Sequence, residues 1–419
     1  MPDCSGARGV GWSDPTFMQQ DLHFPSPPLA RRSWLQQALL CALPAVAPPA
    51  WAQTAAAAPP GLACIDRSDW PAFAARHLQA DGRIVDFDTP RQQSTSEGQS
   101  YGLFFSLVHG DRAAFRRILD WTTANLCDGQ PDRRLPAWQW GQRDDGGWGV
   151  IDANPASDAD LWIAYALLEA GRLWQQPAYT ALARQLLVLV IREEVVRLPG
   201  LGAMLLPWPR SVGKGPVWRL NASYMPLPLL RRLATENPAG PWSEIAQNTV
   251  RMVAATSPHG FVPDWCAWSE ARQAFVTDPE KGAEGSYDAI RVYLWAGMTA
   301  TGDTGRAPLL HSLYGPRALL QSTGRVAERV DTATGTVRGD GPPGFSAALL
   351  PYLRALGHEP LVQARLAFVN LRTAAGQPLL PYYERMLLLF GRGWLEGHFA
   401  FDASGRLQPN PAPPCPANA

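Results

Sequence analysis

Stretches with helical periodicity, joined by short turns, constrain the fold of this chain more than any other feature of its sequence. About twelve such stretches follow one another beyond residue 65, and alternating strand patterns are few. The links at 109–111 and 175–177 are short, and short links favour antiparallel helix neighbours. We expect helices at 68–79, 97–109, 111–127, 158–174, 177–195, 221–235, 241–256, 287–300, 306–320, 345–356, 360–371 and 381–395.

About twelve antiparallel helices can close into a double ring, an (α/α)6 barrel of six inner and six outer helices. A helical solenoid is the competing architecture, but no motif repeats at a fixed period. The predicted fold class is therefore all-α, an (α/α)6 barrel with short strands in long loops at 131–153, 198–219 and 257–285. These loops predict one binding face, because they carry the tryptophans Trp138, Trp140, Trp148, Trp208, Trp218, Trp265 and Trp268.

The first part of the chain has the pattern of a secretory leader. Arg31 and Arg32 precede a short apolar run at 38–43, and Ala50-Trp51-Ala52 offers the small residues that a signal peptidase reads. The paired arginines resemble a twin-arginine signal, and Sec export stays open. We therefore expect a leader at 1–52, a flexible lead-in at 53–62, one folded domain at 63–415, and a periplasmic or secreted protein without a membrane span.

The cysteines and the net charge limit which disulfides, metal sites and partners the folded part can have. Cys64, Cys127, Cys266 and Cys415 follow the leader, and four cysteines allow three pairings. Cys64–Cys415 is the favoured disulfide, because the termini of a domain often lie close together. The formal net charge is +0 and the seven histidines are scattered. We therefore expect no nucleic acid partner, no metal site and no cofactor.

The first candidate functional residue is Glu97, in the stretch Thr95-Ser96-Glu97-Gly98-Gln99-Ser100-Tyr101-Gly102. This carboxylate stands where a polar turn meets an apolar helix. One interpretation is a helix-end charge that complements the helix dipole. The other interpretation is a functional acid, and this stretch alone does not decide between them.

Two later helix starts repeat this arrangement. Asp158 and Asp160 follow Ser157, which suits an N-cap with Asp160 three residues on, as in a capping box. Asp288 follows Ser286, and Arg291 one turn later can pair with it as a structural ion pair. Because Ser157 and Asp160 already serve the cap, Asp158 is the better functional candidate at the second site.

If these helices belong to an inner ring and run the same way, their N-termini converge and the carboxylates line one cleft. Glycoside hydrolysis typically uses two carboxyls on opposite sides of a cleft, one protonated as the acid and one ionised as the base. A helix N-terminus suits an ionised base such as Asp288 but opposes a protonated acid at Glu97. We therefore expect Asp158 or burial to raise the pKa of Glu97.

The three acidic motifs resemble glycoside hydrolase family 8, in particular its periplasmic cellulase branch from bacterial cellulose-synthesis operons. The resemblance spans roughly residues 62–415, and further similar stretches lie between the acidic motifs and after them. They are 134–138, 192–196, 199–202, 344–348 and 390–394.

The resemblance implies an (α/α)6 catalytic domain that hydrolyses internal β-1,4-glucan bonds with inversion, as an endoglucanase acting in cellulose biosynthesis. Glu97 matches the proton donor and Asp288 the general base. Asp158 matches a signature aspartate, which we assign to positioning the sugar and tuning Glu97. The implied substrate-binding residues are Tyr101, Trp138, Trp140, Tyr287 and Arg291, with core packing the alternative for each Trp.

The expected partner is a β-1,4-glucan (cellulose) chain, with the cellulose synthase export complex as a second. Two other functions stay open at this point. One is a hydrolase of the same family that acts on chitosan, xylan or mixed-linkage glucan. The other is a glucan-binding export factor without activity, which the retention of all three carboxylates disfavours.

Overall fold

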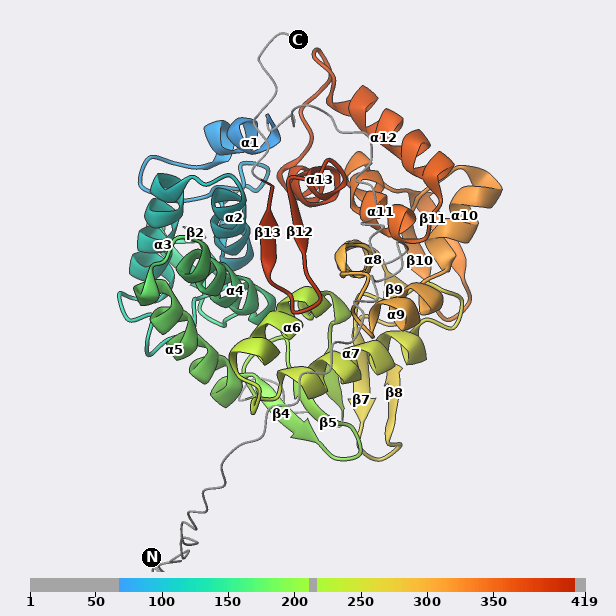
Figure 1. Cartoon of the computed structure of the whole chain (residues 1–419), viewed down its shortest axis with the longest axis horizontal. Helices are drawn as coiled ribbons and strands as arrows, with labels where there is room; N and C mark the ends of the chain where they lie inside the picture. Colours follow the sequence, from blue (N-terminus) through green and yellow to red (C-terminus); the bar gives the residue numbers. More distant parts are fainter. Residues whose placement is uncertain (1–67, 211–216, 411–419) are drawn as a thin grey trace, which may run out of the picture. The chain divides into compact units, whose positions relative to one another are not determined.

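The computed structural model describes residues 68–210 and 217–410, and these residues form the predicted (α/α)6 barrel (Figure 1). Consecutive inner helices contact one another around the ring. Phe390 of the last inner helix packs on Tyr101 and Phe104 of the first, which closes the ring. The inner helices are α2 (Ser96–Val108), α4 (Ser157–Leu173), α6 (Leu227–Glu236), α8 (Ala289–Met298), α11 (Pro343–Ala355) and α13 (Tyr382–Leu395).

The outer helices lie at the periphery of the same view. They are α1 (Asp69–His77), α3 (Arg112–Leu126), α5 (Pro177–Glu193), α7 (Trp242–Thr256), α9 (Arg306–Ser312), α10 (Gly315–Thr323) and α12 (Glu359–Thr373). The single helix predicted at 306–320 is wrong, because the chain turns at 313–314 and α10 restarts with Pro316 in its first turn. Two short helices therefore occupy one outer position. The predicted helix at 221–235 is also divided, into a 3-10 turn η1 (Ala222–Tyr224) and α6.

The inner and outer helices differ in how much of their surface is buried. Every residue from Ser157 to Gly171 of α4 is buried, and so is all of α8. In the outer helix α12, by contrast, only Val362 and Val369 are buried. A helix that is apolar on all sides needs neighbours on all sides, so the sequence of α4 and α8 places them inside.

Short antiparallel strands occupy the loops, as predicted for 131–153, 198–219 and 257–285. Strands β1 (Ser94–Thr95), β2 (Gln139–Gln142) and β3 (Trp148–Asp152) form one sheet, and β6 (Trp218–Leu220), β7 (Cys266–Ser269) and β8 (Ala274–Thr277) form another. The pair β4 (Val195–Leu198) and β5 (Gly202–Leu205) follows α5. Two further elements were not predicted from the sequence: the sheet of β9 (Glu284–Gly285), β10 (Ala327–Asp331) and β11 (Thr336–Asp340), and the hairpin of β12 (Phe399–Phe401) and β13 (Leu407–Pro409).

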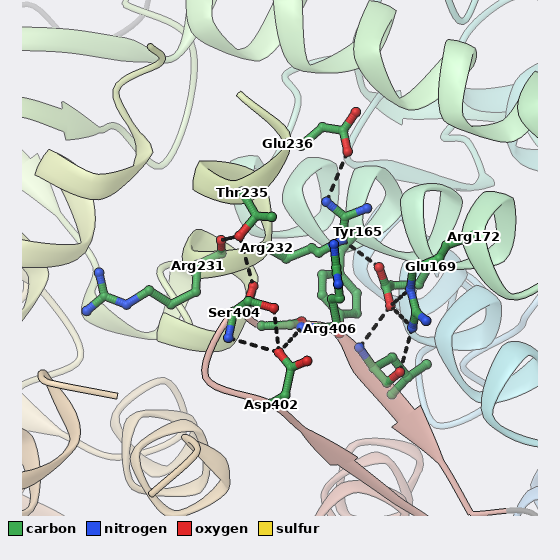
Figure 2. Close-up of polar contacts among 12 residues, drawn as sticks. Tyr165, Glu169, Arg172, Arg231, Arg232, Thr235, Glu236, Asp402, Ser404 and Arg406 are labelled. Atoms are coloured by element: carbon green, nitrogen blue, oxygen red, sulfur yellow. Dashed lines mark hydrogen bonds and ion pairs between the residues drawn. The ribbon is translucent and has the colours of Figure 1, made fainter. Parts of the chain in front are cut away.

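The β12–β13 hairpin lies inside the ring of helices in Figure 1 and is held by charged side chains. Glu169 of α4 is fully buried and accepts a hydrogen bond from the backbone N–H of Leu407 at 2.9 Å. Arg232 donates to the same carboxylate at 2.5 Å and Arg172 pairs with it at 2.5 Å (Figure 2). Tyr165 donates to the carbonyl of Gly405 at 2.8 Å. Glu169 lies about 17 Å along α4 from Asp158, so the hairpin packs at the opposite end of this helix.

Only two of the four cysteines that follow the predicted leader lie within the described residues. Cys127 and Cys266 are buried free thiols. The leader, Cys64 and Cys415 lie outside the described residues, so the favoured disulfide stays a prediction. No helix in the described ranges is long and apolar enough to cross a membrane.

The Glu169 network yields a stability prediction. In Glu169→Gln the buried guanidinium of Arg232 keeps only Glu236, at 3.0 Å, as its carboxylate partner. Breaking a buried ion pair from one side is costly, so we expect the free energy of unfolding to fall by about 3 kcal/mol. Urea unfolding measures this loss, with Asp120→Asn as control, because the Arg116–Asp120 pair is exposed and such pairs contribute little. Equal stability of both variants would contradict a role for Glu169 in holding the hairpin.

Candidate active site

Glu97 lies in the first turn of α2. Thr95 is the N-cap, and its hydroxyl accepts from the N–H of Gly98 at 3.1 Å. A side chain at Gly98 would place its Cβ 2.4 Å from the hydroxyl of Tyr382, so the glycine allows α13 to approach closely. The indole N–H of Trp138, just before β2, donates to Glu97 Oε1 at 3.0 Å. The start of α2 is therefore fixed on both sides of the carboxyl.

The pKa of Glu97 is raised to about 7. Burial is the largest cause and the negative charge of Asp158 is the second, while Arg291 and the Trp138 hydrogen bond oppose them. Glu97 as a residue is only partly buried, and its carboxyl accepts from Trp138, which is 37% exposed. The expected raised pKa is present, from the two causes that the sequence analysis named.

Asp158 lies in the first turn of α4 and is 1% exposed. Its Oδ1 accepts from the N–H of Ala159 at 2.9 Å, and its Oδ2 accepts from Arg291 Nη1 at 3.0 Å. The pKa of Asp158 is raised, because burial outweighs the opposing effects of the Arg291 ion pair and the Ala159 hydrogen bond. Because that guanidinium stabilises the carboxylate of Asp158, the proton of the Glu97–Asp158 pair belongs on Glu97.

The predicted capping box at this helix is wrong. Ala156 is the N-cap of α4 and provides no side-chain cap. Ser157 is already helical, and its hydroxyl has no hydrogen-bond partner in the described structure. Asp160 is fully buried and does not reach back to the helix start. The N-terminus of α4 is instead held by the N–H of Ser157, which donates to the carbonyl of Pro207 at 3.2 Å.

Asp288 stands at the start of α8, and a carboxylate that the sequence analysis missed supports it. Asp264 Oδ1 accepts from the backbone N–H groups of Ser286, Asp288 and Ala289 at 2.8, 3.0 and 2.7 Å. Burial, followed by the charge of Asp288, raises the pKa of Asp264 to about 6. Asp264 therefore caps α8 from another loop, which no local cap pattern in the sequence could reveal.

Arg291 joins the sites. Its Nη2 pairs with Asp288 Oδ1 at 2.5 Å, one turn away as predicted, and its Nη1 reaches Asp158. The same Nη1 donates to the hydroxyl of Tyr101 at 3.3 Å. The guanidinium lies 5.7 Å from the ring centre of Tyr224. The predicted ion pair is thus one half of a bridge between two helices of the inner ring.

The other predicted residues divide into two groups. Trp138 is 37% exposed and contacts Glu97, and Tyr287 is 41% exposed beside Asp288 in the sequence. Trp140 packs instead against Trp121 and Trp148, with Arg83 4.3 Å from its ring centre. The ring contacts of Trp140 are thus to this group and not to the three acids.

A second aromatic group lies on the side of β6 and β7. Trp208 and Trp265 are stacked with ring centres 5.4 Å apart, and Tyr224 is 6.2 Å from Trp265. Arg219 lies over both indoles and is held by Asp278 at 2.7 Å. The charges of Asp158, Glu97 and Asp288, after burial, raise the pKa of Tyr224, so Tyr224 neighbours all three acids.

Tyr224 was not predicted as a site residue, because its segment was predicted to be part of an ordinary helix at 221–235. Trp268, one of the predicted loop tryptophans, is 2% exposed and belongs to the core. Within 68–210 and 217–410, no group of His, Cys, Asp and Glu side chains is arranged to hold a metal ion.

Comparison with known proteins places this site in a family. The profile of glycosyl hydrolases family 8 matches residues 42–397. The chain belongs to this family. It is therefore a glycoside hydrolase, as the three acidic motifs indicated.

Relatives of known name are similar over most of the chain. An endoglucanase of Xanthomonas axonopodis pv. citri (strain 306) is 52% identical over 340 residues, 81% of this chain and 88% of the relative. An endoglucanase of Escherichia coli (strain K12) is 42% identical over 341 residues, 81% of this chain and 90% of that protein. The crystal structure of an endo-1,4-D-glucanase from Vibrio fischeri ES114 superposes with a TM-score of 0.74 at 38% identity, covering 82% of this chain and 99% of that one.

The bridge through Arg291 makes a prediction. Arg291→Met removes the guanidinium that pairs with Asp158 and leaves this carboxylate buried, so unfolding free energy at pH 7 should fall by about 3 kcal/mol or more. Because protonation of Asp158 removes the unpaired charge, the difference from wild type should shrink as the pH falls. Urea unfolding at pH 7 and at acidic pH measures this, and a loss that does not depend on pH would contradict the bridge.

Proposed function

We propose that this protein is an endo-1,4-β-glucanase, a cellulase that hydrolyses internal β-1,4-glucosidic bonds with inversion at the anomeric carbon. The observation that carries the proposal is a carboxyl with a pKa raised to about 7, Glu97, in a cluster whose other two carboxyls, Asp158 and Asp288, pair with the guanidinium of Arg291. Such a division of carboxyls between acid and base is what glycoside hydrolysis requires. The relatives named endoglucanase support the substrate class.

In this mechanism Glu97 is the general acid. It gives its proton to the glycosidic oxygen as the bond from that oxygen to C1 breaks, and the leaving chain departs as an alcohol. Asp288 is the general base and takes a proton from a water molecule, whose oxygen bonds to C1 from the opposite face. Asp288 suits this role because its side chain is 29% exposed, whereas that of Asp158 is 1% exposed.

Asp158 serves the acid. Arg291 and the N–H of Ala159 hold its carboxylate, and its burial disfavours a role as a nucleophile. Its charge raises the pKa of Glu97. That part of its predicted role has support in the geometry, and contact of Asp158 with the sugar stays a prediction.

Aromatic side chains offer surfaces for a glucan. Trp138 is exposed next to Glu97, and the stacked Trp208 and Trp265 flank Tyr224 on the side of β6 and β7. The apolar faces of sugar rings stack on such rings. We therefore assign Trp138 and the Trp208–Trp265 pair to successive glucosyl units. Tyr101 is buried, and its hydroxyl accepts a hydrogen bond from Arg291. It therefore supports the site by holding Arg291.

The setting of the reaction is also a proposal. The arginine pair, apolar run and Ala50-Trp51-Ala52 support export to the periplasm or beyond. There the enzyme would trim β-1,4-glucan during cellulose biosynthesis, beside the cellulose synthase export complex. Cell fractionation with an antibody against the folded domain tests export, since recovery in the cytoplasm alone would contradict it.

Activity of the wild type and of Glu97→Gln decides the reaction. The glutamine keeps the size of the side chain but cannot donate the proton, so release of reducing ends from carboxymethyl-cellulose should fall at least ~100-fold. Xylan, chitosan and mixed-linkage glucan run in parallel test the competing substrates. Proton NMR should show the α-anomer first, and an initial β-anomer would contradict inversion. Full activity of Glu97→Gln would remove Glu97 from the mechanism.

The pH dependence of kcat gives a second test. Because Glu97 must be protonated and its pKa is about 7, kcat should decline above about pH 7. Asp158→Asn removes the negative charge that favours the protonated form, so the alkaline limb should move to lower pH. Trp138→Phe removes a hydrogen bond that favours the ionised form, so the limb should move to higher pH. Shifts in the same direction would contradict this arrangement.

A further inference from the structure

Trp148 is an exposed indole that has no role in the proposed reaction. It lies at the start of β3 and is 46% exposed, more than Trp138 at 37%. In the ranges 68–210 and 217–410, these two are the tryptophans among the exposed large hydrophobic side chains. Tryptophan is highly buried on average in folded proteins, so an indole this exposed at the start of a strand needs a physical explanation.

A group of packed rings supports Trp148 from behind. Its indole stacks on that of Trp140, with ring centres 5.7 Å apart and planes inclined by 24°. Trp140 in turn meets Trp121 of the outer helix α3 edge to face, with ring centres 5.3 Å apart. Trp121 is only 5% exposed. Trp148 is therefore the outermost ring of a series that begins in the core.

Arg83 fixes the two outer rings relative to one another. Its guanidinium carbon lies 4.3 Å from the ring centre of Trp140 and 5.0 Å from that of Trp148. Its Nε donates to the hydroxyl of Ser94 at 2.8 Å, and its Nη2 donates to the carbonyl of Gln92. A cation placed over two indoles attracts both ring faces. The orientation of Trp148 is thus set before any ligand binds.

The register of β2 places these rings away from the three acids. The pairing of β2 with β3 shifts between Gln139 and Trp140, and such an irregularity changes the direction of side chains. Trp138 accordingly contacts Glu97, whereas Trp140 contacts Arg83. Two tryptophans only two residues apart therefore belong to two different surfaces.

The separation along the strand is larger than one sugar ring. Trp148 is the ladder partner of Gln142, which follows Trp138 by four residues. Four residues of a strand span about 13 Å. This exceeds the length of a glucosyl unit. A sugar stacked on Trp148 is therefore not the sugar whose bond Glu97 protonates.

The surroundings of Trp148 suit a sugar better than a protein partner. Gln142, opposite Trp148 in the ladder, is exposed, as are all residues of the turn at 142–146. An indole offers a flat apolar face, and an amide beside it offers both donors and acceptors for hydroxyl groups. Surfaces that bind proteins are typically broad apolar patches, whereas here one ring stands beside polar residues.

We propose that Trp148, supported by Trp140 and Arg83, binds a β-1,4-glucan segment outside the group of three acids, so that a long chain is held at two places. The physical basis is the stacking of the apolar face of a sugar ring on an indole that is already fixed. This inference rests on the proposed function, in which the substrate is a β-1,4-glucan. It adds a preference for long chains, because a short chain bound beside Glu97 does not reach Trp148.

Three variants test the role of the exposed ring. Trp148→Ala removes the ring and leaves Trp140 and Arg83 in place. Trp148→Phe keeps a ring that can stack, so it should retain most of the binding. Tyr314→Ala is the matched control, because Tyr314 is 42% exposed but lies between α9 and α10. Thermal melting of each variant checks that the fold is retained.

Binding is measured by calorimetry in the Glu97→Gln background, so that the glucan is not cleaved. The probes are hydroxyethyl-cellulose as the long chain and cellotriose as the short one. We expect Trp148→Ala to weaken binding of hydroxyethyl-cellulose by about 3- to 10-fold and to leave binding of cellotriose unchanged. Equal affinity for hydroxyethyl-cellulose with and without Trp148 would overturn the proposal.

Two further results would also overturn it. Weaker binding of both probes would mean that Trp148 acts on the cleft and not at a separate surface. A Trp148→Phe variant as weak as Trp148→Ala, or a Tyr314→Ala variant with the same loss, would exclude stacking on Trp148 as the cause. In the otherwise wild-type enzyme, Trp148→Ala should lower kcat/KM on carboxymethyl-cellulose through KM and leave kcat unchanged.

The binding assay separates this inference from the proposed function. If the wild type releases no reducing ends but the Glu97→Gln variant binds hydroxyethyl-cellulose through Trp148, the enzyme assignment fails and the glucan-binding surface stands. If the wild type is active and Trp148→Ala binds as the parent does, only the role of Trp148 fails.

Discussion

The guanidinium of Arg291 is the interaction on which the rest of the site depends. It contacts Asp158, Asp288 and Tyr101 while being only 8% exposed. A lysine could not do the same, because an ammonium is a point charge, whereas the planar guanidinium presents donors in several fixed directions. The inner helices α2, α4 and α8 are thereby joined at their N-terminal ends by one side chain.

The same residue explains how one cluster of carboxyls can hold an acid and a base. Within the described residues, Arg291 is the cation that pairs with the site acids, and it contacts Asp158 and Asp288 but not Glu97. Arg291 stabilises those two carboxylates by ion pairing. Glu97 has no such ion pair, and burial and the charge of Asp158 both favour its protonated form. The pKa of Glu97 is raised despite its place in the first turn of a helix, where the dipole favours ionisation. Burial and a like charge therefore outweigh the helix dipole here.

Sequence patterns predicted what is local and periodic. The inner and outer helices follow from apolar spacing, and the Asp288–Arg291 contact follows from helical geometry. The break between α9 and α10 could have been read from Pro316. The capping box at Ser157 failed because Asp160 is fully buried and its carboxyl oxygens make no hydrogen bond to the start of the helix. The Asp264 cap and the Trp138 hydrogen bond were missed because each joins a loop to a helix start across more than twenty residues.

Charge balance connects the two layers of the site. Glu97, Asp158, Asp160, Glu194 and Asp288 lie close enough to influence one another's protonation, and Arg291 neutralises only part of this charge. Protonation must reduce the negative charge that Arg291 does not neutralise, and the surroundings of each carboxyl determine which one is protonated. In the deeper layer burial is the main cause that raises the pKa of both Asp160 and Glu194 well above their usual values. In the outer layer the pKa of Glu97 is raised to about 7, by burial first and by the charge of Asp158 second. The proton that the reaction needs therefore depends on the enclosure of Glu97 and on a neighbouring carboxylate that Arg291 holds in place.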